Sequence, residues 1–70
     1  MGKEQAYQLT PIEARLLQLL SHGYTEKEVA LQMNKSVFTI DKYMRTIFDK
    51  YGIHNTTAVV AEALRRKEIE

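Results

Sequence analysis

A chain of 70 residues can build one domain around one small core, which excludes a substrate cleft walled by two layers. Its 44% hydrophobic and 27% charged residues are typical of a globular protein rather than a disordered one, and no apolar run reaches the ~20 residues that span a bilayer. The absence of cysteine excludes disulfides and thiolate metal sites, and a net charge of +1 excludes a large, uniformly basic surface.

The first predicted helix begins after Thr10 and ends near His22. Thr10 is a suitable N-cap, Pro11 suits the first helical position, and Glu13 is placed to close a capping box. Gly23 can adopt the left-handed backbone that ends a helix. The apolar face of this helix is formed by Ile12, Leu16, Leu17, Leu19 and Leu20. We expect the helix to be mainly core.

A second helix is predicted to begin after Thr25, because Thr25 and Glu28 repeat the capping-box spacing. Its inward positions are Val29, Ala30 and Met33. The small Ala30 would let a following helix approach closely. Asn34 tolerates left-handed backbone, so it suits a tight turn that ends at Ser36, the N-cap of the next helix.

The third predicted helix runs from Val37 to about Tyr51 and ends at Gly52. Its apolar stripe, at helical spacing, consists of Val37, Ile40, Met44, Ile47, Phe48 and Tyr51. With that stripe buried, a polar and partly basic strip points outward. The strip consists of Phe38, Asp41, Lys42, Arg45 and Asp49.

A last helix is predicted over residues 56–67, with Asn55 as its N-cap. Its apolar face is broader than a domain of this size needs, so part of it is available to a second copy of the chain. We expect a homodimer interface formed by Val59, Val60, Ala63 and Leu64.

The outward strip of the third helix suits the DNA major groove. Lys42 and Arg45 lie one turn apart, and an arginine can contact guanine with two hydrogen bonds. Phe38 could contact a thymine methyl group, whereas the Asp41 carboxylate is repelled by phosphate but can accept a bond from cytosine. These four residues are the predicted base-reading set. The predicted phosphate contacts are Thr25, Lys27, Lys35, Ser36, Thr39, Tyr43 and Lys50.

Another interpretation of the same strip is a solvated helix face. Asp41 and Arg45 have the spacing of an ordinary i, i+4 pair, and single exposed aromatic residues such as Phe38 are common. Low net charge and Asp41 also favour an alternative function, a protein-interaction module on this scaffold. An enzyme is not expected: no nucleophile with a base, no Gly-rich phosphate loop and no cluster of metal ligands is visible, and no cofactor is predicted.

Over nearly its whole length from Leu9, the chain resembles the LuxR-type (GerE-like) DNA-binding domain. The residues that carry the resemblance are Leu9-Thr10-Pro11, Glu13, Leu17, Leu20, Gly23, Lys27-Glu28-Val29-Ala30, Met33, Ser36, Thr39-Ile40, Ile47, Lys50, Gly52, Asn55, Thr57 and Val60. The resemblance implies an all-α, four-helix helix-turn-helix domain whose third helix enters the major groove of double-stranded DNA and whose fourth commonly dimerises. It also implies the output module of a bacterial transcription regulator, preceded by a receiver or sensor domain.

The chain departs from the family pattern on the third helix. Asp41 stands where the family usually has lysine, and Tyr43 where it usually has histidine, while Lys42 and Arg45 occupy positions from which members read bases. Lys35 replaces an apolar residue, and Ile12 and Thr56 replace arginines. These changes bear on the target sequence and the binding strength more than on the fold.

We divide the chain into a leader or linker remnant over residues 1–8 and the DNA-binding domain over residues 9–70. The start has neither a secretory nor a transit pattern, so we expect a cytoplasmic location without a membrane partner.

Overall fold

The computed structural model describes residues 8–70, in which four α-helices and no strands are present. The helices are α1 (Pro11–Ser21), α2 (Glu26–Gln32), α3 (Val37–Tyr51) and α4 (Thr56–Arg65). The predicted all-α, four-helix fold is confirmed. Of the predicted leader, residues 1–7 lie outside the described residues.

Each helix begins at the predicted N-cap. The side chains of Thr10, Thr25, Ser36 and Asn55 each accept a hydrogen bond from the backbone N–H three residues later. Both predicted capping boxes are formed, because Glu13 and Glu28 accept hydrogen bonds from the N–H groups of Thr10 and Thr25. The backbone donors that a helix start leaves unpaired are therefore partly satisfied by local sequence.

Each helix is also followed by a residue with left-handed backbone. These residues are Gly23 (φ 96°), Asn34 (φ 57°), Gly52 (φ 68°) and Lys67 (φ 61°). At Asn34, the N–H of Lys35 then bonds to the carbonyl of Ala30, and at Lys67 the N–H of Glu68 bonds to that of Ala63. The fourth helix was predicted to reach Lys67, but it ends at Arg65 because of this turn.

One hydrophobic core joins the four helices. The buried apolar residues are Leu16, Leu17, Leu19, Val29, Ala30, Ile40, Met44, Ile47, Tyr51, Val59, Ala63 and Ile69. Two residues predicted to be buried are exposed, Ile12 and the 43%-exposed Val37. Both lie in the first turn of their helix. Ile69, which follows α4 outside any helix, enters the core and was not predicted.

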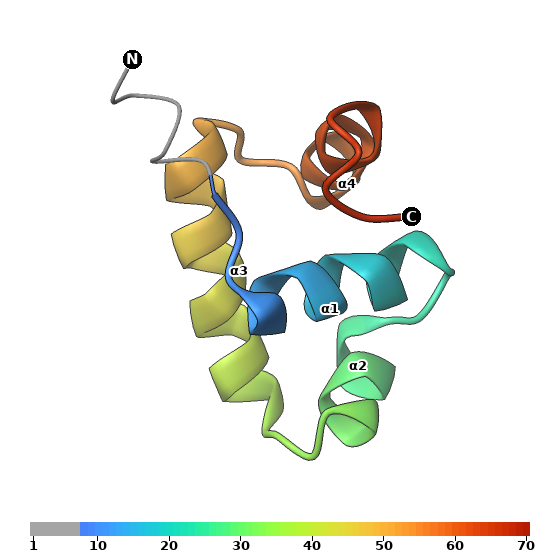
Figure 1. The fold of residues 1–70 in the computed structure, drawn as a ribbon. Coiled ribbons are helices and arrows are strands. Elements are labelled where there is room, and N and C mark those ends of the chain that lie inside the picture. The colour runs from blue at the N-terminus through green and yellow to red at the C-terminus, as the bar shows by residue number, and fades with distance from the viewer. Residues whose placement is uncertain (1–7) are drawn as a thin grey trace.

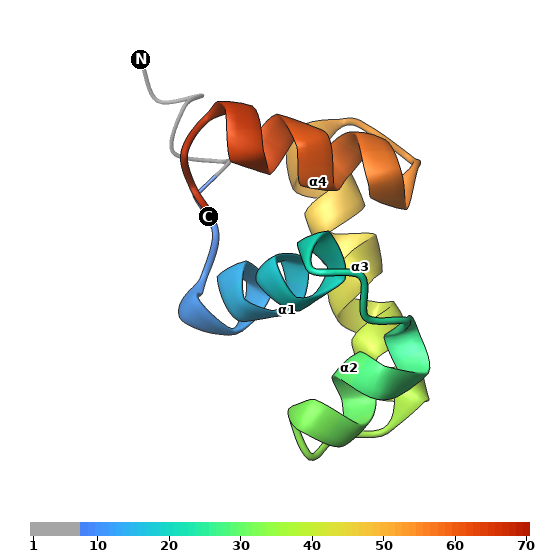
Figure 2. The ribbon, with the colours of Figure 1, turned by 90° about the vertical axis from the view of Figure 1, so that its right-hand side faces the viewer.

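Within residues 8–70, one side of α3 is not covered by another helix. Helices α1 and α3 each contact all the others, whereas α2 and α4 do not touch. Figure 1 shows α1, α2 and α4 on the same side of α3, and Figure 2 shows α2 and α4 at opposite ends of the domain. The short α2, the turn and α3 form the helix-turn-helix unit, in which the buried Ala30 of α2 and Val37 of α3 line the same hollow.

Candidate nucleic-acid interface

The four predicted base-reading residues lie together on the uncovered side of α3. Phe38, Asp41, Lys42 and Arg45 line one shallow depression. Phe38 is 72% exposed, so most of its side-chain surface is accessible to a partner. The helical periodicity therefore placed this set correctly relative to the core.

The side chains of this face are held in pairs along the helix. The Arg45 Nε donates to Asp41 Oδ2 at 3.0 Å, and the Lys42 ammonium lies 5.7 Å from the centre of the Phe38 ring. Both pairs have i, i+4 spacing, which brings side chains on a helix surface together. Asp49, one further turn along, makes no ion pair with Arg45 within residues 8–70.

The ionic charges of this face cancel. Asp41 and Asp49 carry two negative charges, and Lys42 and Arg45 carry two positive ones. Contact with phosphate must therefore come mainly from neighbouring residues rather than from this face.

Two of the predicted phosphate-binding lysines are available for that role. Lys27, near the start of α2, and Lys35, just before α3, are both exposed and have no ionic partner within residues 8–70. Thr25 and Ser36 act as N-caps beside them, and the Ser36 hydroxyl also lies 3.0 Å from that of the half-buried Thr39. Lys35 thus lies beside the start of α3, which has no acidic residue in its first turn and favours phosphate, whereas Glu26 and Glu28 occupy the first turn of α2 near Lys27.

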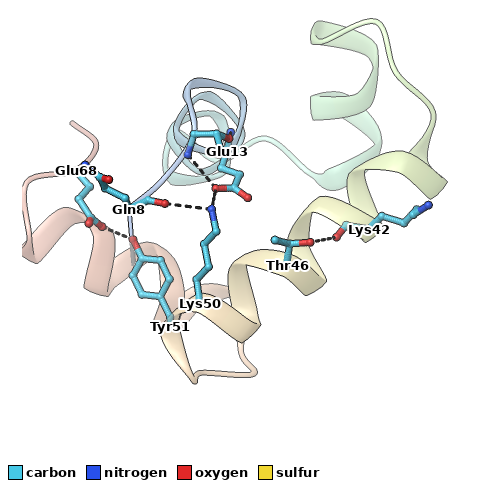
Figure 3. Close-up of polar contacts among 8 residues, drawn as sticks. Gln8, Glu13, Lys42, Thr46, Lys50, Tyr51 and Glu68 are labelled. Atoms are coloured by element: carbon cyan, nitrogen blue, oxygen red, sulfur yellow. Dashed lines mark hydrogen bonds and ion pairs between the residues drawn. The ribbon is translucent and has the colours of Figure 1, made fainter. Parts of the chain in front are cut away.

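Two other predicted phosphate contacts are placed differently. Tyr43 is half-buried and packs against the core. Lys50 donates to the Glu13 Oε1 at 2.5 Å and to the carbonyl oxygen of Gln8 at 3.1 Å. Figure 3 shows Lys50 reaching toward Glu13 and Gln8, while Lys42 extends away from them. Lys50 is therefore a structural residue here, and we omit it from the proposed phosphate contacts.

The predicted dimer residues on α4 divide into two kinds. Val59 and Ala63 have no exposed surface in the single chain, because they contribute to its own core. Val60 is half-buried and Leu64 is exposed. Within this set, Val60 and Leu64 are therefore the residues that present surface to another copy in the single chain.

Ionisable groups near the C-terminal end of the domain shift one another's pKa values. Burial, together with a hydrogen bond from its hydroxyl to the Glu68 carboxylate, raises the pKa of Tyr51. The guanidinium groups of Arg65 and Arg66 lower the pKa of Glu62, and Glu62 in turn raises the pKa of Arg66. The same side chains connect the segment after α4 to α3 and α4.

Neither a metal site nor a membrane segment was found in the described part of the chain. No three histidine or acidic side chains are grouped so that they could hold a metal ion. Among the helices of residues 8–70, none has the length and apolar character needed to cross a bilayer.

Comparison with known proteins gives the family. Residues 7–63 match the bacterial regulatory proteins of the luxR family. The chain belongs to the LuxR family. Its four helices are those expected of that family's helix-turn-helix domain, and membership assigns the chain in general terms to DNA-binding regulation of transcription.

Several curated relatives of this LuxR-family chain are regulators. Response regulator Rre1 of Synechocystis sp. is 39% identical over 56 residues, covering 80% of this chain and 24% of the relative. Probable transcriptional regulator ycf29 of Porphyra purpurea is 31% identical over 61 residues, covering 87% and 29%. The uncharacterized response regulatory protein YgeK of Escherichia coli is 34% identical over 58 residues, covering 83% and 40%. The chain therefore spans less than half the length of each of these relatives.

Proposed function

We propose that this domain binds double-stranded DNA sequence-specifically, with α3 inserted in the major groove, and so directs a bacterial transcription regulator to its operator. The observation that carries the proposal is the shared exposed face of Phe38, Asp41, Lys42 and Arg45 on the side of α3 that no other helix covers. Lys27 and Lys35 flank that helix and would contact the phosphates.

The proposal is tested by selecting duplexes from a random pool and measuring their affinity by fluorescence anisotropy at several salt concentrations. Because Lys27 and Lys35 are the principal free cations beside the face, we expect a shallow log–log salt slope, about −2 to −4. Lys42→Ala and Arg45→Ala should each weaken the selected duplex about tenfold or more.

Arg15→Ala is the matched control, since Arg15 is an exposed basic residue on α1. It removes the same charge away from the proposed groove face, so it should change affinity less than twofold. Failure of the wild-type protein to enrich any duplex, even at low salt, would contradict the proposal.

We also propose that the domain is the output module of a longer regulator that carries a receiver or sensor domain, and that it pairs through α4. Two of the relatives are named response regulators or response regulatory proteins, and each is more than twice as long as this chain's match. The exposed Leu64 beside Val60 is the available apolar surface of α4. Sedimentation equilibrium should show a dimer that Leu64→Glu dissociates, and a wild-type protein that stays monomeric on its operator would refute pairing through α4.

A second candidate function, a protein-interaction module, is favoured by exposed apolar residues near the α2–α3 unit. Leu31 is 81% exposed and Phe38 is also largely exposed. This function predicts that Phe38→Ala weakens a protein complex, while Lys42→Ala and Arg45→Ala leave DNA affinity unchanged. The DNA measurements above therefore separate the two functions.

A further inference from the structure

We propose that Asp41 is a positioning residue for Arg45, and that it thereby sets the base preference of the groove face for a G·C pair. This inference rests on the proposed DNA-binding function and extends it by assigning one base pair of the target. Asp41 is the acidic residue among the four predicted base-reading residues, and its negative charge is the opposite of what phosphate binding requires.

The Asp41–Arg45 pair contributes little as a stabilising contact. Its side chains are 48% and 76% exposed, and ion pairs this open to water have little effect on folding. The carboxylate also opposes DNA affinity, because it is repelled by every phosphate near the groove. Neither fold stability nor general attraction to DNA therefore accounts for an acidic residue here.

The geometry of the pair leaves the recognition edge of Arg45 free. Asp41 Oδ2 accepts a hydrogen bond from Nε only, and the Nη1 and Nη2 groups have no partner within residues 8–70. The guanidinium is planar with its five N–H groups in a fixed fork, so engaging Nε fixes the direction in which the outer N–H pair points. That pair matches the O6 and N7 acceptors of guanine.

Restraining the Arg45 guanidinium in this way improves discrimination between bases more than it raises affinity for DNA in general. A free arginine can swing to a phosphate or to another base, whereas a restrained one loses less freedom on binding guanine and reaches alternatives poorly. The Lys42 ammonium is restrained similarly by its place over the Phe38 ring. The face thus presents two oriented cations instead of two mobile ones.

Asp41→Asn tests the proposal, because it removes the charge and keeps the shape. The probe is the duplex that the wild-type protein selects from a random pool, together with variants in which each G·C pair is replaced in turn by A·T. We expect one replacement to weaken wild-type binding about tenfold or more. That penalty should disappear in Arg45→Ala and shrink at least threefold in Asp41→Asn, while affinity for random duplex rises.

Asp49→Asn is the matched control, since it removes the same charge about two turns along α3, at a residue that makes no hydrogen bond or ion pair with Arg45 within residues 8–70. It should raise affinity for all duplexes alike and leave the penalty intact. Asp41→Glu keeps a carboxylate within reach and should restore part of the penalty lost in Asp41→Asn. In the free protein, ¹⁵N relaxation of the Arg45 Nε should show faster motion in Asp41→Asn than in the wild type.

The outcomes separate this inference from the proposed function. If the wild-type protein binds its selected duplex and Asp41→Asn lowers the penalty no more than Asp49→Asn does, Asp41 is not a positioning residue, although the DNA-binding function stands. If the wild-type protein binds no duplex, both proposals are wrong. Unchanged Arg45 Nε motion in Asp41→Asn would also overturn the positioning role.

Discussion

Lys67 holds a backbone conformation that suits glycine better than lysine. Its φ of 61° lies in the left-handed region, and this turn ends α4 and directs Ile69 into the core. A side chain in that region costs about 1 kcal/mol relative to glycine. The burial of Ile69, which this turn directs into the core, offsets the backbone strain at Lys67.

We expect Lys67→Gly to raise the free energy of unfolding by about 1 kcal/mol, because it relieves the left-handed strain. Urea unfolding followed by circular dichroism measures the change. Lys67→Ala is the control, since it removes the charge but keeps the Cβ, and it should be close to neutral. Equal effects of the two variants would show that the backbone at Lys67 is not strained.

The carboxylate of the buried Glu13 accepts hydrogen bonds from two donors. Its Oε1 accepts hydrogen bonds from the Thr10 N–H at 3.0 Å and from Lys50 Nζ at 2.5 Å. Removing the lysine leaves a carboxylate in a buried position without its cation, which is more costly than losing the pair as a whole.

Lys50→Met should therefore lower the free energy of unfolding by about 2–3 kcal/mol, and the double variant Glu13→Gln with Lys50→Met should recover about half of that loss. Thermal and urea unfolding give both values. Lys42→Met, on the exposed face of the same helix, should remain within about 0.5 kcal/mol of the wild type. A single variant no more destabilised than the double variant would contradict this role for Glu13.

At the scale of elements, α2 depends on tertiary packing. Seven residues are too few for an isolated helix, so α2 persists through its caps and through contacts with α1 and α3. Ala30 is nearly fully buried at the α2–α3 contact. The small side chain sets how closely the two helices approach, and hence how α3 is presented.

Ala30→Leu should lower the free energy of unfolding by about 1–3 kcal/mol, because the added atoms have no space at this contact. DNA affinity should fall with it, since α3 would be displaced. Leu31→Ala is the matched control: it removes a larger apolar group at the next position, but from an exposed site, and should change stability by less than about 0.5 kcal/mol. If the two variants rank in the opposite order, α2 does not pack on α3 as described.

The sequence predicted these elements well where local rules apply. All four N-caps were predicted, because Ser, Thr and Asn bind the helix-start N–H groups through atoms only three residues away. The outer face of α3 followed from the 3.6-residue period in the same way. The end of α4 was predicted too late, since lysine gives no signal for left-handed backbone.

Contacts between distant residues could not be predicted from local patterns. Glu13 and Lys50 are 37 residues apart, so only the folded chain shows that Lys50 is engaged. Helical periodicity likewise predicts the side of the helix on which a side chain lies, but not whether residues of other elements cover it. It therefore placed Val37 in the core, although Val37 is exposed, and it did not show that Ala63 is enclosed within the single chain.

At the scale of the whole molecule, the C-terminal end of α3 holds both ends of the domain. Lys50 binds the carbonyl of Gln8, and the adjacent Tyr51 donates its hydroxyl to the Glu68 carboxylate (Figure 3). Arg66 lies over the Tyr51 ring, 5.2 Å from its centre. The segments that precede α1 and follow α4 are thus hydrogen-bonded to α3, the helix that we propose inserts into the DNA major groove.

This arrangement predicts how stability depends on pH. Burial, and then the hydrogen bond to Glu68, raises the pKa of Tyr51 above its ordinary value near 10. Below pH 10 the tyrosine is protonated in both the folded and the unfolded chain, so its contribution to stability is fully present. Above pH 10 the unfolded chain loses the proton while the folded chain keeps it, so stability falls by up to about 1.4 kcal/mol per pH unit.

Tyr51→Phe removes both the hydrogen bond and this titration. It should lower the free energy of unfolding by about 1–2 kcal/mol between pH 7 and 9, and the difference from the wild type should shrink as the pH rises from 10 to 11. Urea unfolding at each pH measures this difference, in which the other tyrosines and the lysines cancel because both proteins share them. Two stability curves that stay parallel through pH 11 would show that the Tyr51 hydroxyl is not held in the folded chain.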